Sequence, residues 1–594
     1  MQHLIHNGLV VPKYEWKRLS IKIRGKEVQL TPHQEEMAVA WVKKLGTDYV
    51  NDKVFVKNFF SDFCEALGLK EKLDPADFDF SAIIDYVEKE KAAKLSLSKA
   101  EKKRLSEERK KMKEAAKEKF GYALVDGVKT EISNYVAEPS CIFMGRGRHP
   151  KRGCWKQGPS EEDIELNLSP DAPLPPGGWK RTWQKDVMWV ARWMDHLSGK
   201  MKYVWLAESS TPKQMKDIQK FEKAKELQKN IERIKNHIVA NLDSADVKRR
   251  KTATVCYLID KFKIRVGDEK DPDEADTVGA STLRPEHIKF GEDGKVTLHF
   301  LGKDSVPHIF EENLPENVIR NLKEFSSNAK STLFSGVDST RVSEFLGEVV
   351  SGLSAKVFRT YYASQAVKGK LDTSPVKVDD PDYFKKYVAT MANLEAARTC
   401  NHKRTIPKTW ASSLQKQEEK LEGLIEKSRV AQANMQRLIK EKEQQFLTVL
   451  NREEERLKTL MRDLEILQRS DSEMCSGKPN LSLARRIAQK KKAIKVQRER
   501  IRRIRERRLE HIKRLEERRD VKLQRDKTAI ERLRLQVEAK KKTRDFNLGT
   551  SLKSYIDPRI YYNWGQNVNY DWKLYYPKSL QKKFSWVENN SVTY

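Results

Sequence analysis

A long, charge-saturated segment, residues 410–546, restricts the possible folds of this chain more than any other feature. Apolar residues recur in it at three-and-four spacing, which is the pattern of a coiled-coil seam. Gly477 and Pro479 interrupt the pattern between residues 470 and 481, and a second striped run follows. Two such helices of similar length predict an antiparallel hairpin with arms of roughly 85 Å. The expected seam positions are Leu421, Leu424, Ala431, Met435, Leu438, Leu457, Leu460, Leu464, Leu467, Ile487, Ile494, Ile501, Ile504, Ile512, Leu515 and Ile530.

The two arms of this hairpin differ in charge. The first arm is the more acidic one, whereas the second is dominated by Lys and Arg. We therefore expect charge pairing across the arms, with an excess of positive charge left for a polyanion. The sequence leaves two roles open for the hairpin: a solvated spacer, or an arm that contacts the polyanion.

The whole chain is basic, with a net charge of +31 over 594 residues. This charge favours nucleic acid as the partner, with an anionic membrane surface as the competing possibility. No run of about 18 apolar residues is present, so we expect no membrane-spanning helix. The length and the low apolar content, 38%, predict two to four structural units that include a long solvated helical part.

The six cysteines do not form a metal-binding or disulfide pattern. No two of them have CxxC spacing, so we expect neither a zinc cluster nor a disulfide scaffold, and a reducing compartment is indicated. Residues 1–9 lack both the apolar core of a signal peptide and an Arg- and Ser-rich presequence.

The first two hundred or so residues mix helices with short strands. Thr31-Pro32 is a helix start, and the apolar stripe after it predicts an amphipathic helix over 35–45. Residues 95–119 are rich in Lys, Glu and Ala and predict a solvated helix, while 187–193 and 202–207 predict strands. The two expected apolar faces comprise Met37, Val39, Ala40, Trp41 and Leu45 in the first helix, and Phe55, Phe59, Phe60 and Phe63 after it.

A glycine-rich basic loop occupies residues 143–156. Three glycines lie there among six basic residues, so the backbone and the side chains can approach a phosphate backbone closely. The alternative is a disordered basic loop without a ligand.

Two basic residues later in the chain lie at the ends of predicted elements. Arg265 ends a mostly buried helix predicted over 252–266, where it is either a structural cation or a functional one. Lys303 lies in the turn that follows a strand predicted over 297–301, as in a hairpin. A solvated turn lysine is the alternative interpretation for Lys303.

Two further residues are candidates because of their neighbours. Arg359 lies among aromatic residues in a helix start over 354–364, so we expect it to be buried and either paired or kept for an anionic ligand. His402 lies in a helix expected to end at Pro407. The adjacent cations should make it resist protonation and favour a phosphate; they are Arg398, Lys403 and Arg404.

A short segment near the carboxy terminus contains an unusually placed tyrosine. Gly549 and Asp557-Pro558 punctuate the chain on both sides of Tyr555, among basic residues. The functional interpretation is a nucleophile for phosphoryl transfer, which a phenol can be when cations or a base assist it. The structural alternative is one more packed ring in an aromatic-rich tail.

Taken together, the dispersed motifs resemble those of eukaryotic type IB DNA topoisomerases, in the same order over nearly the whole chain. The resembling segments are Phe143–Gly147 with His149–Lys151, Arg265 with Gly267 and Ala275–Gly279, Phe300–Ser305, Lys356–Tyr361, Asn401-His402, and Leu548–Arg559. The resemblance implies a mostly helical α+β protein, built as a two-lobed DNA clamp with a mixed α/β cap. It also implies the domains 1–212 (cap), 213–410 (catalytic core), 411–545 (coiled-coil linker) and 546–594 (carboxy-terminal domain with the tyrosine).

The same resemblance assigns roles to individual residues. Tyr555 would be the nucleophile, forming a 3′-phosphotyrosine. The other catalytic residues would be Arg265, Lys303, Arg359 and His402, with Lys303 protonating the leaving 5′-oxygen and either water or His402 taking the phenolic proton. The residues expected to contact DNA are Arg146, Lys151, Lys156, Asp304 and Ser554. No cofactor and no metal are expected, the partner would be double-stranded DNA, and the protein would be a nuclear monomer.

The chain departs from the family pattern at Met144, where Arg is usual, and at Ser554, where Asn is usual. Because Ser554 replaces the usual Asn, the resemblance does not imply sensitivity to camptothecin-type poisons. We expect a coiled-coil hairpin longer than is typical of the family, and the given sequence does not include the long charged amino-terminal tail of many members. The rival interpretations are a tyrosine recombinase or integrase, which uses similar catalytic residues, and a non-catalytic basic coiled-coil protein that binds nucleic acid.

Overall fold

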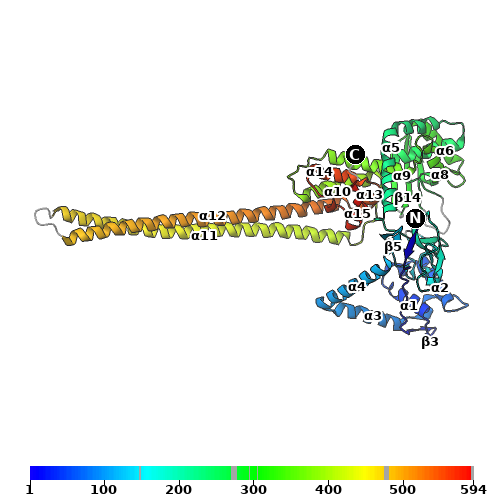
Figure 1. Cartoon of the computed structure of the whole chain (residues 1–594), viewed down its shortest axis with the longest axis horizontal. Helices are drawn as coiled ribbons and strands as arrows, with labels where there is room; N and C mark the ends of the chain where they lie inside the picture. The colour runs from blue at the N-terminus through cyan, green and yellow to red at the C-terminus, as the bar shows by residue number, and fades with distance from the viewer. Residues whose placement is uncertain are drawn as a thin grey trace. The chain divides into compact units, whose positions relative to one another are not determined.

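The computed structural model describes residues 1–145, 147, 149–268, 277–292, 294–303, 306–473 and 481–589. The chain forms two compact units. The first comprises Met1–Asp380, Met391–Thr405 and Phe546–Tyr594, and the second comprises Pro381–Thr390 and Ile406–Asp545. Helices predominate and the sheets are small, which confirms the predicted mostly helical α+β class (Figure 1).

The first unit begins with an aromatic core. Helix α1 (Pro32–Val42) starts at Thr31, which forms a capping box with Gln34. Trp41 stacks on Phe59 of helix α2 (Lys53–Ala66) with ring centroids 4.7 Å apart, and the four predicted phenylalanines are all buried. The prediction for Leu45 is wrong, because it lies beyond the end of α1 and is exposed.

Small sheets and two exposed helices complete this amino-terminal part. Helix α4 (Lys99–Phe120) has no buried residue, which confirms the solvated helix, and it follows helix α3 (Ser81–Ser96). The sheets, in spatial order, are β1 (Leu4–His6), β5 (Tyr122–Val125) and β6 (Val128–Glu131); β3 (Lys26–Gln29), β2 (Ser20–Ile23) and β4 (Phe78–Asp79); β10 (Lys180–Thr182), β9 (Glu165–Asn167), β11 (Trp189–Met194) and β12 (Met201–Trp205); and the pair β7 (Cys141–Ile142) and β8 (Trp155–Lys156).

A second, helical core follows in the same unit. Apolar side chains of the helices pack with those of a three-stranded antiparallel sheet in one continuous cluster. The sheet has the order β13 (Ile288–Phe290), β14 (Lys295–Gly302), β15 (Val306–Asn313), and Gly302 pairs with Val306 at its hairpin end. The helices are α5 (Thr211–Asn241), α6 (Val247–Phe262), α7 (Glu316–Ser327), α8 (Ser339–Gly347) and α9 (Ala355–Asp372).

The carboxy-terminal segment packs into the first unit through aromatic and ionic contacts. Helix α13 (Leu548–Ser554) leads to Tyr555, and Asp557 caps helix α14 (Pro558–Val568). Buried Arg559 binds Asp557 and reaches Glu222 of α5 at 2.5 Å. Helix α15 (Lys578–Lys583) follows, and its Lys583 contacts Asp217 of α5 at 2.8 Å.

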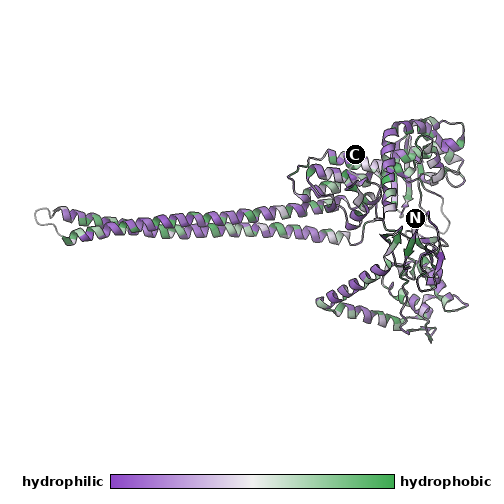
Figure 2. Cartoon of the chain, in the orientation of Figure 1, coloured by the Kyte–Doolittle hydropathy of each residue, from purple (hydrophilic) through white to green (hydrophobic). Residues whose placement is uncertain are grey.

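The second unit contains the predicted antiparallel hairpin. Helices α11 (Trp410–Glu473) and α12 (Leu481–Lys542) have 64 and 62 residues, so each arm is about 95 Å long at about 1.5 Å per residue. They lie side by side (Figure 1), and hydrophilic and hydrophobic residues alternate along both (Figure 2). Every predicted seam position is buried or half-buried except Leu438, which is exposed because its neighbour Ile439 occupies the seam.

Ion pairs across the arms confirm the expected charge pairing. Arg505 binds Glu454 at 2.6 Å, and Arg508 binds Glu443 at 2.7 Å. The pairs are partly exposed, so they contribute little to stability individually and instead help to fix the register of the two arms. Helix α10 (Asp382–Thr399) begins in this unit and ends in the first. Among the described residues, none of the helices has an apolar stretch long enough to cross a bilayer.

Candidate active site

Arg265 lies in an extended segment after helix α6, so the prediction that it ends that helix is wrong. The helix stops at Phe262 because Lys263 adopts a left-handed backbone conformation, with φ of 55°. The Arg265 carbonyl then accepts a hydrogen bond from the amide of Ala280 at 2.8 Å. The amide of Val278 bonds to the Leu301 carbonyl of β14 at 2.7 Å, so the 278–280 segment connects Arg265 to the strand that leads to Lys303.

Two glycines allow the backbones to approach each other behind Arg265. Gly267 has a φ of +87°, and a Cβ placed on Gly279 would lie 2.6 Å from the Gly267 backbone. Only glycine tolerates this separation, because the obstructing atoms belong to the main chain and cannot rotate away. The pair therefore fixes the position of the segment that presents Arg265.

Gly279→Ala is expected to destabilise the protein by about 1–3 kcal/mol, since the added methyl group forces the two backbones apart. Urea unfolding measures this change in stability. Gly369→Ala in α9 is the matched control, because a Cβ there has no atom within 4 Å. It should instead stabilise the fold by about 0.5–1 kcal/mol. Equal behaviour of the two variants would refute the role of the glycine contact.

Lys303 extends from the end of strand β14 with an exposed side chain, as predicted for a hairpin turn. Asp304 and Ser305, which follow in the sequence, lie outside the described residues. His308 of β15 packs behind this end of the hairpin, stacked on Phe300 with ring centroids 5.4 Å apart. A Cβ on Gly302 would lie 2.5 Å from the His308 ring, so the imidazole directly supports the backbone before Lys303.

Arg359 is buried in helix α9, as predicted, with 4% of its surface exposed. Its Nη2 donates to the Cys400 carbonyl at 2.6 Å and its Nη1 donates to the Tyr555 hydroxyl at 2.9 Å. Among the described residues its Nε atom is buried without a hydrogen-bond partner. A buried guanidinium with an unused donor is suited to an anionic ligand.

His402 follows a turn instead of lying in a helix, so the predicted helix that ends at Pro407 is wrong. Helix α10 stops at Thr399, and Asn401 adopts a left-handed conformation with φ of 53°. The side-chain amide of Asn401 donates from Nδ2 to the Phe262 carbonyl at 2.9 Å, at the end of α6. This hydrogen bond joins the turn that carries His402 to the segment that carries Arg265.

The electrostatic environment of His402 also differs from the prediction. Burial, followed by the charges of Arg359 and Arg265, lowers the pKa of His402 to about 2. The imidazole therefore resists protonation, as expected, but the cations responsible come from distant parts of the chain and not from its neighbours in sequence. Its Nδ1 lies 2.6 Å from the Ser551 hydroxyl, and its Nε2 is buried without a partner among the described residues.

The depressed pKa of His402 predicts a pH dependence of stability. Below pH 6.5 the unfolded chain takes up a proton at this residue that the folded protein does not, so the free energy of unfolding should fall as the pH falls. The slope is about 1 kcal/mol for each pH unit between pH 6 and 4. His402→Gln should remove this contribution in urea unfolding experiments, and an unchanged slope in that variant would contradict the burial of a neutral imidazole.

Tyr555 lies immediately after α13 and is 4% exposed. The Arg359 guanidinium carbon lies 4.6 Å from the centre of its ring, and the His402 ring lies 4.8 Å away. Burial lowers the pKa of Arg265. The Tyr555 hydroxyl raises this pKa and the charge of Arg359 lowers it, because both groups lie near the Arg265 guanidinium. Ser364 of α9 donates to the Tyr555 carbonyl at 3.3 Å and accepts from the Asp557 amide at 3.1 Å.

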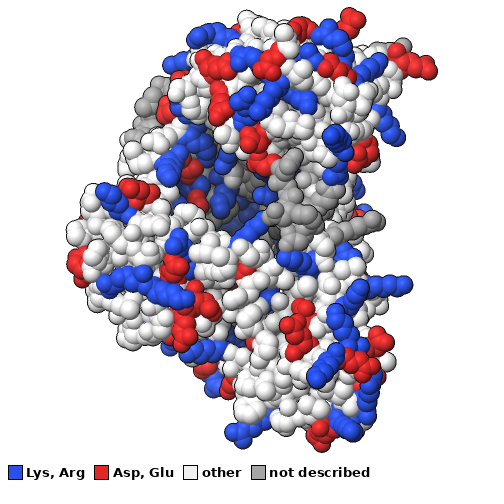
Figure 3. Space-filling model, turned by 90° about the vertical axis from the view of Figure 1, so that its right-hand side faces the viewer, with Lys and Arg blue, Asp and Glu red and all other residues white. Residues whose placement is uncertain are grey.

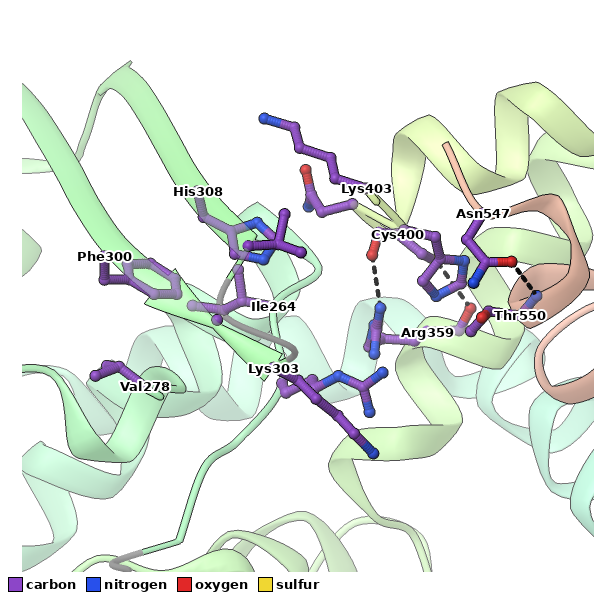
Figure 4. A pocket seen from close by; sticks show the side chains of 15 residues that line it. Ile264, Val278, Phe300, Lys303, His308, Arg359, Cys400, Lys403, Asn547 and Thr550 are labelled. Atoms are coloured by element: carbon purple, nitrogen blue, oxygen red, sulfur yellow. Dashed lines mark hydrogen bonds between the residues drawn. The ribbon is translucent and has the colours of Figure 1, made fainter. Parts of the chain in front are cut away.

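These side chains line two spaces that share Arg265, Lys303 and Arg359. One is lined by Arg265, Lys303, Arg359 and His402 (Figure 4). The other has a volume of about 630 Å³ and is lined by the first three of these residues together with Tyr555 and Ser554. Figure 3 shows Lys and Arg side chains gathered in a hollow on one face of the molecule. The structure thus brings together all five residues predicted to be catalytic, from segments far apart in the sequence.

The predicted DNA-contacting residues are distributed differently. Ser554 lines the cavity beside Tyr555, whereas Lys151 and Lys156 line neither space. The amine of Lys151 donates to the Leu197 carbonyl at 2.8 Å, and Lys156 is paired with Glu138 and with Asp195, the latter at 3.1 Å. Arg146 and Asp304 lie outside the described residues.

Sequence reasoning missed two residues of this site. His308 lines the same space as Lys303, and burial followed by the charges of Lys403, Arg359 and Arg265 lowers its pKa to about 4. Ser551 is fully buried against His402. A periodic pattern does not distinguish either residue from an ordinary strand or helix position. Within the described part of the chain, no group of three or more His, Cys, Asp or Glu side chains is arranged to hold a metal ion.

Comparison with known proteins shows which family this chain resembles. Residues 209–436 match the catalytic core of eukaryotic DNA topoisomerase I, residues 1–206 match its DNA-binding fragment, and residues 527–594 match a C-terminal topoisomerase domain. The DNA topoisomerase 1 of Candidozyma auris is 32% identical over 643 aligned residues, which cover 99% of this chain and 82% of that protein. The chain belongs to the eukaryotic DNA topoisomerase I family.

Other topoisomerase relatives differ in length. DNA topoisomerase 1 beta of Arabidopsis thaliana is 32% identical over 98% of this chain, which spans 58% of that protein. The mitochondrial DNA topoisomerase I of Rattus norvegicus is 30% identical over 96% of this chain and 87% of its own length. Membership of the topoisomerase I family makes the chain a type IB enzyme that acts on DNA, as the resemblance of its motifs predicted.

Proposed function

We propose that this chain relaxes positive and negative supercoils by cutting one strand of duplex DNA, letting it swivel, and resealing it without ATP. Tyr555 attacks a backbone phosphorus to form a 3′-phosphotyrosine, and the bond to the 5′-oxygen breaks. The observation that carries the proposal is the 2.9 Å hydrogen bond from Arg359 to the Tyr555 oxygen, in a cavity that Arg265 and Lys303 also line. Resealing needs no nucleotide because the phosphotyrosine retains the energy of the broken phosphodiester.

Arg265, Arg359 and His402 hold the non-bridging oxygens of the phosphate in this scheme. Negative charge on these oxygens is greatest in the pentacovalent transition state, so donors fixed in advance around them lower the barrier. The unpaired Nε of Arg359 and the unpaired Nε2 of His402, among the described residues, support this assignment because both are buried donor positions without a protein acceptor.

Lys303 protonates the leaving 5′-oxygen, and after strand rotation it takes the proton back. Its place at the exposed end of a hairpin supports this role, since the flexible amine can reach a leaving group at the cavity mouth. The proton of the Tyr555 hydroxyl passes to a neighbouring water or to His402. The hydrogen bond from Arg359 stabilises the phenolate as it forms.

The rest of the chain would grip the duplex. We assign residues 1–212 and 213–410 to the two lobes of a clamp, 411–545 to the linker and 546–594 to the domain that supplies the nucleophile. Arg146, Lys151, Lys156, Asp304 and Ser554 would contact DNA near the cleavage site. Lys151 and Lys156 have to exchange their present protein partners for phosphates in order to do so. Binding through phosphates predicts weak sequence selectivity and a strong dependence on salt.

We further propose that the protein acts as a monomer in the nucleus. All five candidate catalytic residues come from one unit of one chain, which supports a monomer. A mitochondrial relative makes the mitochondrion the alternative compartment. Fluorescence microscopy of the tagged full chain distinguishes the two compartments.

Relaxation of supercoiled plasmid in EDTA, without ATP and without a second DNA partner, tests the proposed function. Relaxation of both positively and negatively supercoiled plasmid is expected, because the cationic side chains supply the electrophilic assistance and no strand exchange is involved. A requirement for ATP or for a specific donor site would refute the proposal, and the second result would favour a tyrosine recombinase.

A further inference from the structure

The hydrogen bond between His402 and Ser551 is buried on both sides. Nδ1 of His402 lies 2.6 Å from the Ser551 hydroxyl oxygen. Ser551 is 0% exposed and His402 is 5% exposed, so water does not compete for this contact. The contact also joins two distant parts of the chain, the turn after α10 and helix α13.

The protonation state of the imidazole makes the direction of this hydrogen bond important. Burial and the nearby guanidiniums of Arg359 and Arg265 lower the pKa of His402, so the ring is neutral and carries a single N–H. If that proton were on Nδ1, Nε2 would present a lone pair to an approaching anionic phosphate, which is repulsive. If Ser551 instead donates to Nδ1, the proton is on Nε2, and this atom has no partner among the described residues.

We propose that Ser551 is a positioning residue whose hydroxyl donates to Nδ1 of His402, holding the ring proton on Nε2 so that it can donate to a non-bridging oxygen of the scissile phosphate. This inference rests on the proposed function of the site and specifies how His402 takes part in it. It also excludes His402 as the acceptor of the Tyr555 proton, because the only unprotonated ring nitrogen is occupied by Ser551. Water then takes that proton.

The position of Ser551 links this tautomer to the nucleophile. Ser551 lies on α13, and the amide of Tyr555 donates to the Ser551 carbonyl at 3.0 Å. The hydroxyl that sets the imidazole and the phenol that attacks phosphorus therefore belong to the same helical turn. Docking of α13 supplies both, so the imidazole is fixed in its donor form only when the nucleophile is in place.

The first test observes the tautomer directly in the full-length protein without DNA. ¹⁵N-histidine labelling and two-bond ¹⁵N–¹H spectra distinguish Nε2–H from Nδ1–H, and His402→Gln identifies the signals of His402. We expect the Nε2–H form in the wild type and in Ser551→Thr, and a mixture of forms in Ser551→Ala. A wild-type proton on Nδ1 would overturn the inference.

The second test measures single-turnover cleavage. Ser551→Ala should slow cleavage by about 10- to 100-fold, and Ser551→Thr should restore most of the rate. In a His402→Gln background the amide donor has no tautomers, so Ser551→Ala should add almost nothing. Equal slowing by Ser551→Ala in both backgrounds would show a merely structural role and overturn the inference.

Ser364→Ala is the matched control. Ser364 is also a buried serine beside Tyr555, but among the described residues its hydroxyl hydrogen-bonds to the backbone of Tyr555 and Asp557. It should leave the His402 tautomer unchanged; a mixture of tautomers in this variant would overturn the specific role of Ser551. The spectra need no catalysis, so they decide the tautomer even if Tyr555 proves not to be the nucleophile.

Discussion

Tyr555→Phe is expected to abolish DNA cleavage, lowering the rate by at least about 10⁴-fold. The substitution removes the hydroxyl that we propose attacks phosphorus and that accepts the hydrogen bond from Arg359. It leaves the ring in place against His402, so the site should keep its shape. Trapping measures the effect: the protein is denatured during turnover, and the residue bonded to DNA is identified. The wild type should yield a Tyr555 adduct and the variant none.

The matched control for this prediction is Tyr561→Phe. Tyr561 is another buried tyrosine in the same carboxy-terminal segment, and its ring packs against those of Tyr575 and Tyr576. It should retain cleavage and form the usual adduct. A Tyr555→Phe protein that still becomes covalently attached to DNA would rule out Tyr555 as the nucleophile.

Lys303→Ala is expected to slow cleavage of ordinary DNA by about 10²- to 10⁴-fold, the range for loss of a general acid. The same variant should cleave a 5′-phosphorothiolate strand at nearly the wild-type rate. Sulfur is a good leaving group without protonation, so the modified strand does not need the acid. Single-turnover assays on matched oligonucleotides measure both rates.

Lys403→Ala separates acid catalysis from general loss of positive charge. Lys403 lines the same space as Lys303, so its removal weakens attraction for DNA without removing the proposed acid. Any slowing in this variant should be equal for the two substrates. If Lys303→Ala also slows both substrates equally, its role is electrostatic and the assignment as general acid fails.

Local patterns in the sequence predicted many of the elements of the fold. The seam of the hairpin, the capped helix after Thr31 and the turn at Lys303 all follow from side-chain period and turn chemistry, which act over a few residues. The errors in these predictions also concern only one or two neighbouring residues. Leu438 and Ile439 are adjacent and equally apolar, so only the packing of the two arms decides which of them is buried.

The backbone around Arg265 and His402 could not be predicted in this way. Both residues follow helices that stop at left-handed positions, Lys263 and Asn401, where neither glycine nor proline signals the end. Tertiary contacts, such as the hydrogen bond from Asn401 to Phe262, stabilise these turns. The predicted helices, over 252–266 and up to Pro407, therefore ran too far in both places.

The prediction that these residues meet in one site came from the resemblance to a family and not from local sequence patterns. Nothing in the sequence near His402 indicates that Arg359 and Arg265 lower its pKa, or that Ser551 binds its Nδ1. These residues lie between about 40 and 150 positions apart in the sequence, so a comparison of neighbouring residues cannot reveal their contacts. His308 was missed for a different reason: the strand pattern does not show that its ring lies against the backbone of Gly302 across the hairpin.

Residues on both sides of the long hairpin meet again within the first unit. Lys403 forms an antiparallel bridge with Phe546, and the amide of Asn547 donates to the His402 carbonyl at 2.7 Å. The residues that flank the hairpin segment therefore lie next to each other in the first unit. Insertions or deletions of whole turns along the hairpin would alter reach and charge while the imidazole and the phenol kept their spacing.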